Sequence, residues 1–189
     1  MRTEVLGVGF DSLTMEEAVD RAFSIIKEGK KGKAAYVVTP NPEIVWLCRL
    51  EPELKKAIDE AFLVLPDGIG IIHGARILGT PLKEKVPGID FAQALMARMA
   101  AEGMSVFLLG AKDGVAQQAA ERLKERFPGL VIAGTHHGYF SEDEPIINII
   151  NEAEPDLLLV CLGAPKQEFW MRNNAEKLNV GLMAGLGGT

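Results

Sequence analysis

Short apolar runs alternate with longer amphipathic segments along most of the chain. Six of the runs have strand length and are apolar almost throughout, which is typical of parallel strands covered on both faces. They lie at residues 34–38, 62–65, 106–109, 130–133, 157–161 and 180–184. The pattern therefore predicts a sheet whose strands are buried on two sides.

Amphipathic segments between these runs predict helices. Thr14 and Glu17 have the spacing of a capping box, and apolar residues follow at helical spacing up to a stop at Gly29. Further helices are expected to begin after Pro42 and near Ile69, and others to occupy residues 91–102, 115–127, 145–153 and 167–178. This order predicts one α/β domain over residues 1–189, with a Rossmann-like, mostly parallel sheet, helices on both faces and a small additional N-terminal β element.

Composition and charge narrow the classes of function. The chain has 189 residues, a formal net charge of -6 and a sequence pI near 5.2, which argues against general nucleic-acid binding. Its two cysteines, Cys48 and Cys161, have no metal or redox spacing, so we expect a reducing, cytosolic setting. We find neither a signal-peptide pattern nor an apolar run long enough to span a bilayer, so any membrane role is expected to be peripheral.

Nearly every predicted strand is followed by a turn that combines glycine with a polar residue. In open α/β sheets, ligands bind beyond the carboxyl ends of the strands, and free N–H groups at helix starts attract phosphate. The turns occupy residues 39–43, 66–68, 110–114, 134–139, 163–168 and 185–189. Each turn alone is explained by turn geometry, but together they favour a diphosphate-bearing ligand.

Asp67 is the sharpest candidate for chemistry, because it follows a predicted buried strand directly and stands between Pro66 and Gly68. Two interpretations are open. Asp67 is either the N-cap of the helix that begins near Ile69, or a general base at the carboxyl edge of the sheet. The second interpretation uses Gly68 to leave room for a substrate.

Two other stretches carry candidate binding groups. Thr39 and Asn41 have a backbone restrained by neighbouring prolines and offer hydrogen bonds to a sugar, although capping of the following helix is a strong alternative. Lys166 opens a predicted helix against the helix dipole, which indicates a nearby anion. Arg76 is expected to face either the same cleft or solvent.

Several familiar site patterns are missing or incomplete. His136 and His137 are adjacent, so in a strand they would point to opposite faces and form no metal pair. No DxD motif is present, and neither metal nor cofactor is predicted. The segments that begin at Gly7 and Gly68 both lack the third glycine of G-x-G-x-x-G, so a nicotinamide oxidoreductase is a weaker alternative. Residues 79–88 are a candidate mobile loop, for which a plain surface connection is favoured.

The assembled turns resemble those of one family. The motifs are Leu65-Pro66-Asp67-Gly68-x-Gly70, Val86-Pro87-Gly88-x-Asp90, residues 106–110, Gly138-Tyr139-Phe140, residues 163–168 and Gly185-x-Gly187-Gly188. In this order they resemble the WecG/TagA/CpsF glycosyltransferases, glycosyltransferase family 26, from about Thr39 to the last residue. The pair Pro-Asp-Gly and Pro-Lys-Gln-Glu is specific, whereas either motif alone would be weak.

The resemblance implies an activity. Members transfer a sugar from a UDP donor to a sugar linked to undecaprenyl diphosphate, at the inner face of the cell membrane and without a metal. The wall teichoic acid branch transfers N-acetylmannosamine from UDP-ManNAc to lipid-linked N-acetylglucosamine, forming a β-1,4 linkage with inversion. By this resemblance Asp67 is the base. The resemblance implies substrate-binding roles for Thr39, Asn41, Pro165, Lys166, Gln167, Glu168, Gly185, Gly187 and Gly188, and position along the predicted cleft adds Gly68, Arg76, Gly110, Gly138 and Gly163.

The sequence departs from the family in two places. The family continues past its final glycines with a segment rich in arginine and aromatics, which contacts the membrane, whereas this chain stops at Thr189. We therefore expect weak turnover and self-association into a homo-oligomer through the uncovered face. Ala111 stands where the family usually has glycine. Another UDP-sugar, a binding module without activity and an oligomerising scaffold remain alternatives.

Overall fold

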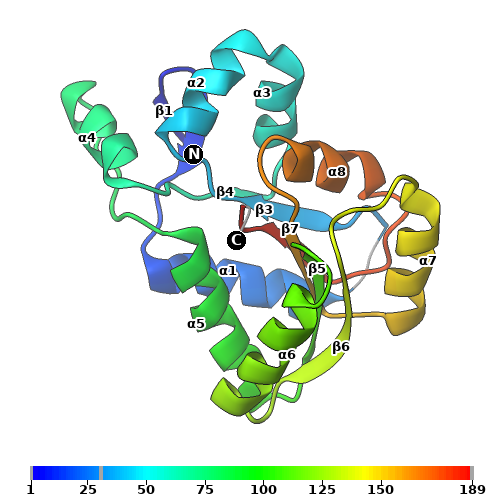
Figure 1. Cartoon of the computed structure of the whole chain (residues 1–189). Coiled ribbons are helices and arrows are strands. Elements are labelled where there is room, and N and C mark those ends of the chain that lie inside the picture. Colours follow the sequence, from blue (N-terminus) through cyan, green and yellow to red (C-terminus); the bar gives the residue numbers. More distant parts are fainter. Residues whose placement is uncertain (1, 30–31, 188–189) are drawn as a thin grey trace.

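The computed structural model describes residues 2–29 and 32–187, and it has the predicted Rossmann-like α/β architecture (Figure 1). A parallel sheet of six strands lies at its centre, in the order β4-β3-β8-β7-β5-β6. These strands are β3 (Ala35–Val38), β4 (Leu63–Val64), β5 (Ser105–Gly110), β6 (Val131–His136), β7 (Leu157–Cys161) and β8 (Leu182–Gly185). The expected N-terminal β element is confirmed as an antiparallel pair, β1 (Arg2–Val5) and β2 (Val8–Asp11).

Helices cover both faces of the sheet (Figure 1). They are α1 (Met15–Glu28), α2 (Pro42–Leu50), α3 (Pro52–Asp59), α4 (Ile69–Ile77), α5 (Gly88–Ala101), α6 (Val115–Arg126), α7 (Asp143–Ala153) and α8 (Lys166–Asn174). Helices α1, α5 and α6 share one apolar cluster with the sheet, and α2, α3, α4, α7 and α8 share the other. Because both faces are buried, the central strands are apolar on both sides, as their sequences predict.

The connections change face within the sheet, between neighbouring strands β7 and β5. The chain leaves β5 through α6 on one face, whereas it leaves β7 through α8 on the opposite face. The two connections therefore diverge at the carboxyl ends of these strands. Such a topological switch point leaves the crevice in which open α/β sheets bind ligands.

Most predicted elements occur within a few residues of their expected bounds, with instructive exceptions. Strand β6 was expected to end at Ala133, but it continues to His136, which pairs with Leu109 of β5. Gly134 marks no turn: a Cβ at this position would lie 2.5 Å from Cε2 of the Phe107 ring, so the glycine accommodates that ring. Helix α3 was not predicted, and it begins directly after α2.

Candidate active site

The expected site residues gather at one edge of the sheet because all six strands run in the same direction. In spatial order across this edge, the turns after β4, β3, β8, β7, β5 and β6 carry Asp67, Thr39, Gly187, Gly163, Ala111 and Gly138. Strand β4 is four strand spacings from β5, which corresponds to roughly 19 Å at about 4.8 Å per spacing. The candidate site is therefore an extended edge, with Asp67 near one end and the switch point near the other.

Asp67 lies at the N-terminus of α5. Its Oδ2 accepts a hydrogen bond of 3.1 Å from the N–H of Gly88, the first residue of that helix. The N-cap of α4 is Gly68, with no side-chain cap, so the alternative interpretation of Asp67, as the cap of this helix, is wrong. A carboxylate has about four acceptor positions. The bond from Gly88 occupies one of them, and the half-buried side chain keeps acceptor capacity for a substrate hydroxyl.

Thr39 and Asp67 both contact Gly88, the first residue of α5. A Cβ added to Gly88 would lie 2.7 Å from Thr39 Oγ1, so this helix start approaches Thr39 as closely as glycine allows. Thr39 Oγ1 also donates to the carbonyl of Gly185, at 3.4 Å. Asn41 has the capping role given as its alternative: its Oδ1 accepts from the N–H of Ile44 at 3.0 Å, at the start of α2.

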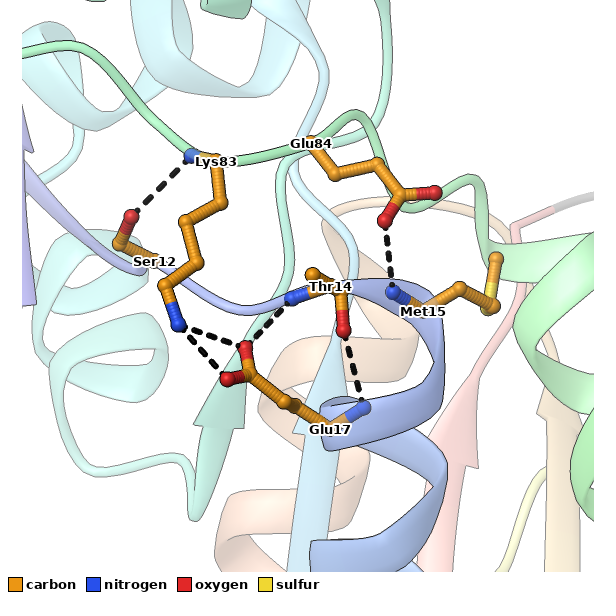
Figure 2. Close-up of polar contacts among 6 residues, drawn as sticks. All are labelled: Ser12, Thr14, Met15, Glu17, Lys83 and Glu84. Carbon is orange, nitrogen blue, oxygen red and sulfur yellow. Dashed lines mark hydrogen bonds and ion pairs between the residues drawn. The ribbon is translucent and has the colours of Figure 1, made fainter.

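The loop that brings Gly88 to Asp67 is anchored to the start of α1 (Figure 2). Lys83 Nζ contacts both carboxylate oxygens of Glu17, at 2.7 and 2.9 Å, and the backbone N–H of Lys83 donates to Ser12 Oγ. Glu84 accepts from the N–H of Met15 at 3.0 Å. Residues 79–88, a candidate mobile loop in the sequence, therefore form an anchored surface connection.

Glu17 also completes the predicted capping box. Its carboxylate accepts from the Thr14 N–H at 2.8 Å, and Thr14 Oγ1 accepts from the Glu17 N–H, as Figure 2 shows. The hydrogen bond from Lys83, together with the one from Thr14, lowers the pKa of the Glu17 carboxyl below its ordinary value. The anchor thus involves a group that already stabilises the start of α1.

A cavity of about 530 Å³ lies at the switch point between β5 and β7. It is lined by Ala111, Lys112, Val115, Gly138, Tyr139, Cys161, Leu162 and Lys166. Lys166 Nζ donates to the carbonyl of Gly138 at 3.1 Å and lies 5.2 Å from the centre of the Phe140 ring. Two cationic side chains, Lys112 and Lys166, therefore border one cavity, an arrangement that favours binding of an anion.

Lys112 and Tyr139 were not singled out from the sequence. Both lie in turns that the pattern did place at this edge, so position in a turn after a strand was the available signal. The Tyr139 side chain is 72% exposed. An exposed aromatic ring at the rim of a cationic cavity offers a flat apolar face to a ligand.

The backbone at this end of the edge is tightly packed. Gly110 has a φ of 140°, and a Cβ on it would lie 2.3 Å from the carbonyl oxygen of Cys161 on β7. Ala111 has a φ of 57°, in the left-handed region that favours glycine. Its carbonyl accepts from the N–H of Gly138 at 2.9 Å, which joins the turn after β5 to the turn after β6.

Gln167 and Glu168 are positioned differently from the other expected ligands. Their side chains are only 2% and 1% exposed, so both groups lie inside the protein beneath the edge. Gln167 Nε2 donates to Glu168 Oε1, and Gln167 Oε1 accepts from the N–H of Gly187, each at 3.0 Å. Burial raises the pKa of the Glu168 carboxyl. Gly188, another expected ligand, lies outside the described residues.

The remaining expected groups are more dispersed. Gly163 and Pro165 form the turn into α8, where their carbonyls accept backbone hydrogen bonds from that helix. Arg76 is exposed on α4, whose apolar side is buried against β1 at the periphery of the molecule in Figure 1. His136 and His137 do not point to opposite faces, because His137 follows the end of β6 and the two ring centres lie 4.4 Å apart.

Neither a metal-binding cluster nor a membrane-spanning helix occurs within the described residues, 2–29 and 32–187. Within these ranges, no group of three or more His, Cys, Asp or Glu side chains is placed to hold a metal ion. Across the same ranges, no helix combines the length and the apolar character needed to cross a bilayer.

Comparison with known proteins identifies the family. A model described as "Glycosyl transferase WecG/TagA/CpsF family" matches residues 3–189. The chain belongs to this family. The match begins well before Thr39, where the resemblance was expected to start, and so includes the N-terminal β pair.

Two relatives illustrate the similarity of this WecG/TagA/CpsF chain to curated proteins. It is 33% identical over 159 residues to a Bacillus spizizenii protein, covering 84% of this chain and 62% of the relative. It is 31% identical over 189 residues to a Staphylococcus aureus protein, covering 100% of this chain and 74% of the relative. Both relatives are named N-acetylglucosaminyldiphosphoundecaprenol N-acetyl-β-D-mannosaminyltransferase.

Proposed function

We propose that this protein is a glycosyltransferase that moves N-acetylmannosamine from UDP-ManNAc to N-acetylglucosamine linked to undecaprenyl diphosphate. Family membership and the names of the two relatives support the reaction. The observation that carries the proposal is the arrangement of the sheet edge, with a carboxylate near one end and a cationic cavity near the other. A group transfer needs both, a base for the acceptor and positive charge for the departing group.

The cavity at the switch point is proposed to bind the uridine end of the donor, so that the diphosphate and the sugar extend along the edge, past the turns after β7 and β8, toward Asp67. Lys112 and Lys166 supply positive charge on the side of the diphosphate, and α6 and α8 begin at the lining residues Val115 and Lys166, so the positive ends of both helix dipoles lie beside the cavity. The exposed ring of Tyr139 offers a surface on which a base can stack. These groups stabilise the negative charge that develops on UDP as it leaves.

Asp67 is proposed to act as the general base. The acceptor 4-hydroxyl oxygen attacks the anomeric carbon of the donor, its proton passes to the Asp67 carboxylate, and the bond from that carbon to the UDP oxygen breaks. A single displacement of this kind forms a β-1,4 linkage with inversion. Thr39, which adjoins Asp67 through Gly88, is placed to orient a sugar hydroxyl.

The lipid-linked acceptor suggests where the protein works. We propose that residues 1–189 act as one catalytic domain that associates peripherally with the inner face of the cell membrane, where such an acceptor resides. The acceptor named for the relatives supports this location. Sedimentation with vesicles that contain the acceptor lipid, compared with vesicles that lack it, measures the association directly.

Substitution of Asp67 tests the mechanism. Asp67→Asn keeps the size of the side chain and removes its basicity, so transfer is expected to slow by about a hundred- to ten-thousand-fold. The affinity for UDP, measured by calorimetry, is expected to stay unchanged. Asp113→Asn is the matched control, because Asp113 is an exposed carboxylate at the same edge. Near-normal transfer by Asp67→Asn would exclude Asp67 as the base.

A ligand panel tests the donor and the alternative classes. UDP-ManNAc is expected to support transfer better than UDP-GlcNAc or UDP-glucose, and a different preferred sugar would move the protein to another polysaccharide of the cell surface. UDP is expected to raise the melting temperature while NAD leaves it unchanged, because only a bound ligand stabilises the folded state. The opposite result would favour the oxidoreductase alternative.

A further inference from the structure

Gln167 and Glu168 form a buried polar pair whose function the site description leaves open. They are two of the polar side chains that the described structure buries almost completely, at 2% and 1% exposure. The Oε2 atom of Glu168 is buried without a hydrogen-bond partner. Burying a carboxyl oxygen without a partner costs stability, and an apolar side chain at this position would avoid that cost.

The two hydrogen bonds of Gln167 determine which way its amide points. The N–H of Gly187 can only donate, so it requires the amide oxygen, and this contact measures 3.0 Å. Glu168 Oε1 accepts from the amide nitrogen on the other side, also at 3.0 Å. With an apolar residue in place of Glu168, the amide would lose the partner that holds its nitrogen away from Gly187.

We propose that Glu168 is a positioning residue, which holds the Gln167 amide with its oxygen toward the N–H of Gly187 and so fixes the glycine turn after β8. The Leu186 N–H of this turn donates to the Val160 carbonyl at 3.1 Å, and at the next residue, Gly187, which has a φ of 87° and open space where a Cβ would lie, the N–H donates to the Gln167 amide oxygen. A side chain from α8 thus controls the backbone in the middle of the candidate active site.

The packing around Gln167 supports this role. A Cβ added to Gly185 would lie 3.1 Å from Gln167 Nε2 and 2.7 Å from Met171 Cε, so the glutamine fills the space beside the end of β8. The carbonyl of Gly185 accepts in turn from Thr39 Oγ1. Contacts therefore run from Glu168 through Gln167 and the end of β8 to Thr39, the neighbour of the proposed base.

The charge state of Glu168 is compatible with the role. Burial raises the pKa of its carboxyl, which favours the protonated form. Either form keeps an oxygen lone pair that accepts from the Gln167 amide. Glu168→Gln, which resembles the protonated acid and keeps an acceptor oxygen, is therefore expected to preserve the positioning, whereas Glu168→Leu removes it.

Hydrogen exchange at the Gly187 amide, followed by NMR, tests the positioning without reference to activity. Glu168→Leu and Gln167→Leu are both expected to speed this exchange roughly fivefold, the value that corresponds to one net hydrogen bond. Glu168→Gln is expected to exchange like the unmodified protein. Asn174→Leu is the matched control, because Asn174 is also buried on α8 but bonds to Asp143 and Trp170 instead.

The consequence for the site rests on the proposed function and is measured separately, as the dissociation constant of UDP and the KM for the donor. Glu168→Leu is expected to raise both about fivefold, and Glu168→Gln to restore them. Unchanged exchange at Gly187 in Glu168→Leu would overturn the proposal. Faster exchange with unchanged donor KM would overturn the positioning role in the site. If the unmodified protein binds no UDP, the proposed function fails, and exchange alone still decides whether Glu168 holds the turn.

Discussion

Replacement of Gly110 by alanine is expected to lower the free energy of unfolding more than the same replacement of a glycine with open space around it. Gly110 ends β5 and pairs with Cys161 of β7, at the strands that flank the switch point. A Cβ there would lie 2.3 Å from the Cys161 carbonyl oxygen and 2.6 Å from its carbonyl carbon. Both atoms belong to the backbone of a central strand, so the contact cannot be relieved by turning a side chain.

The expected loss follows from two costs and one gain. A backbone conformation that L residues rarely adopt, here a φ of 140°, costs about 1–3 kcal/mol. Forcing an additional methyl group into packed structure costs about 1–3 kcal/mol more. Alanine recovers about 0.4–1 kcal/mol by restricting the unfolded chain. The free energy of unfolding is therefore expected to fall by roughly 2–5 kcal/mol.

Gly103→Ala is the control that separates the cost of the close contact at Gly110 from the cost of a backbone with positive φ. Gly103 also has a positive φ, 67°, but a Cβ on it would meet nothing within 4 Å. Its substitution is expected to cost about 1 kcal/mol, the left-handed strain less the gain in the unfolded chain. Urea unfolding followed by circular dichroism measures both variants. Equal losses at the two positions would refute the inference that β5 and β7 touch too closely at Gly110 to admit a side chain.

Three further outcomes are expected. Ala111→Gly relieves left-handed strain of about 1–2 kcal/mol and loses about 0.4–1 kcal/mol in the unfolded chain, so the melting temperature rises slightly; a drop would mean that Ala111 is unstrained. Lys83→Met raises the pKa of the Glu17 carboxyl toward its ordinary value, as NMR titration measures, and an unmoved pKa would show that the anchor is absent in solution. Because the pKa of Glu168 is raised in the folded state, the folded protein holds a proton that the unfolded chain releases near pH 4.5. Stability measured by urea unfolding therefore falls as pH rises from this value through the folded pKa, and Glu168→Gln removes that slope; an unchanged slope would assign it to another group.

The sequence predicted the fold well, since fully apolar runs separated by helical patterns are compatible with few architectures. The prediction failed at residues whose structural role differs from the one typical of their type. Gly134 resembled a turn signal, yet it lies inside β6 and makes room for the Phe107 ring. Such a contact between strands is a property of the register, which local composition does not encode.

The candidate site was predicted only in part. The order of turns along a parallel sheet placed Asp67 and the glycine turns at one edge, because every strand ends there. The burial of Gln167 and Glu168 was not foreseen, since a polar pair at a helix start usually faces solvent. Lys112 was overlooked because a charged residue in a loop carries no local sign of the cavity that it borders.

The span between β4 and the β5–β7 crevice has a consequence for inhibitor design. Since roughly 19 Å separates these strands along the edge, a compact molecule fits only one end and leaves the other open. A bisubstrate compound that joins a uridine group for the cavity to an amino sugar for the Asp67 end, through a spacer that replaces the diphosphate across the β8 turn, would engage both ends at once. Its second contact would be intramolecular, so the spacer length that matches the span should maximise avidity, and shorter or longer tethers should lose it.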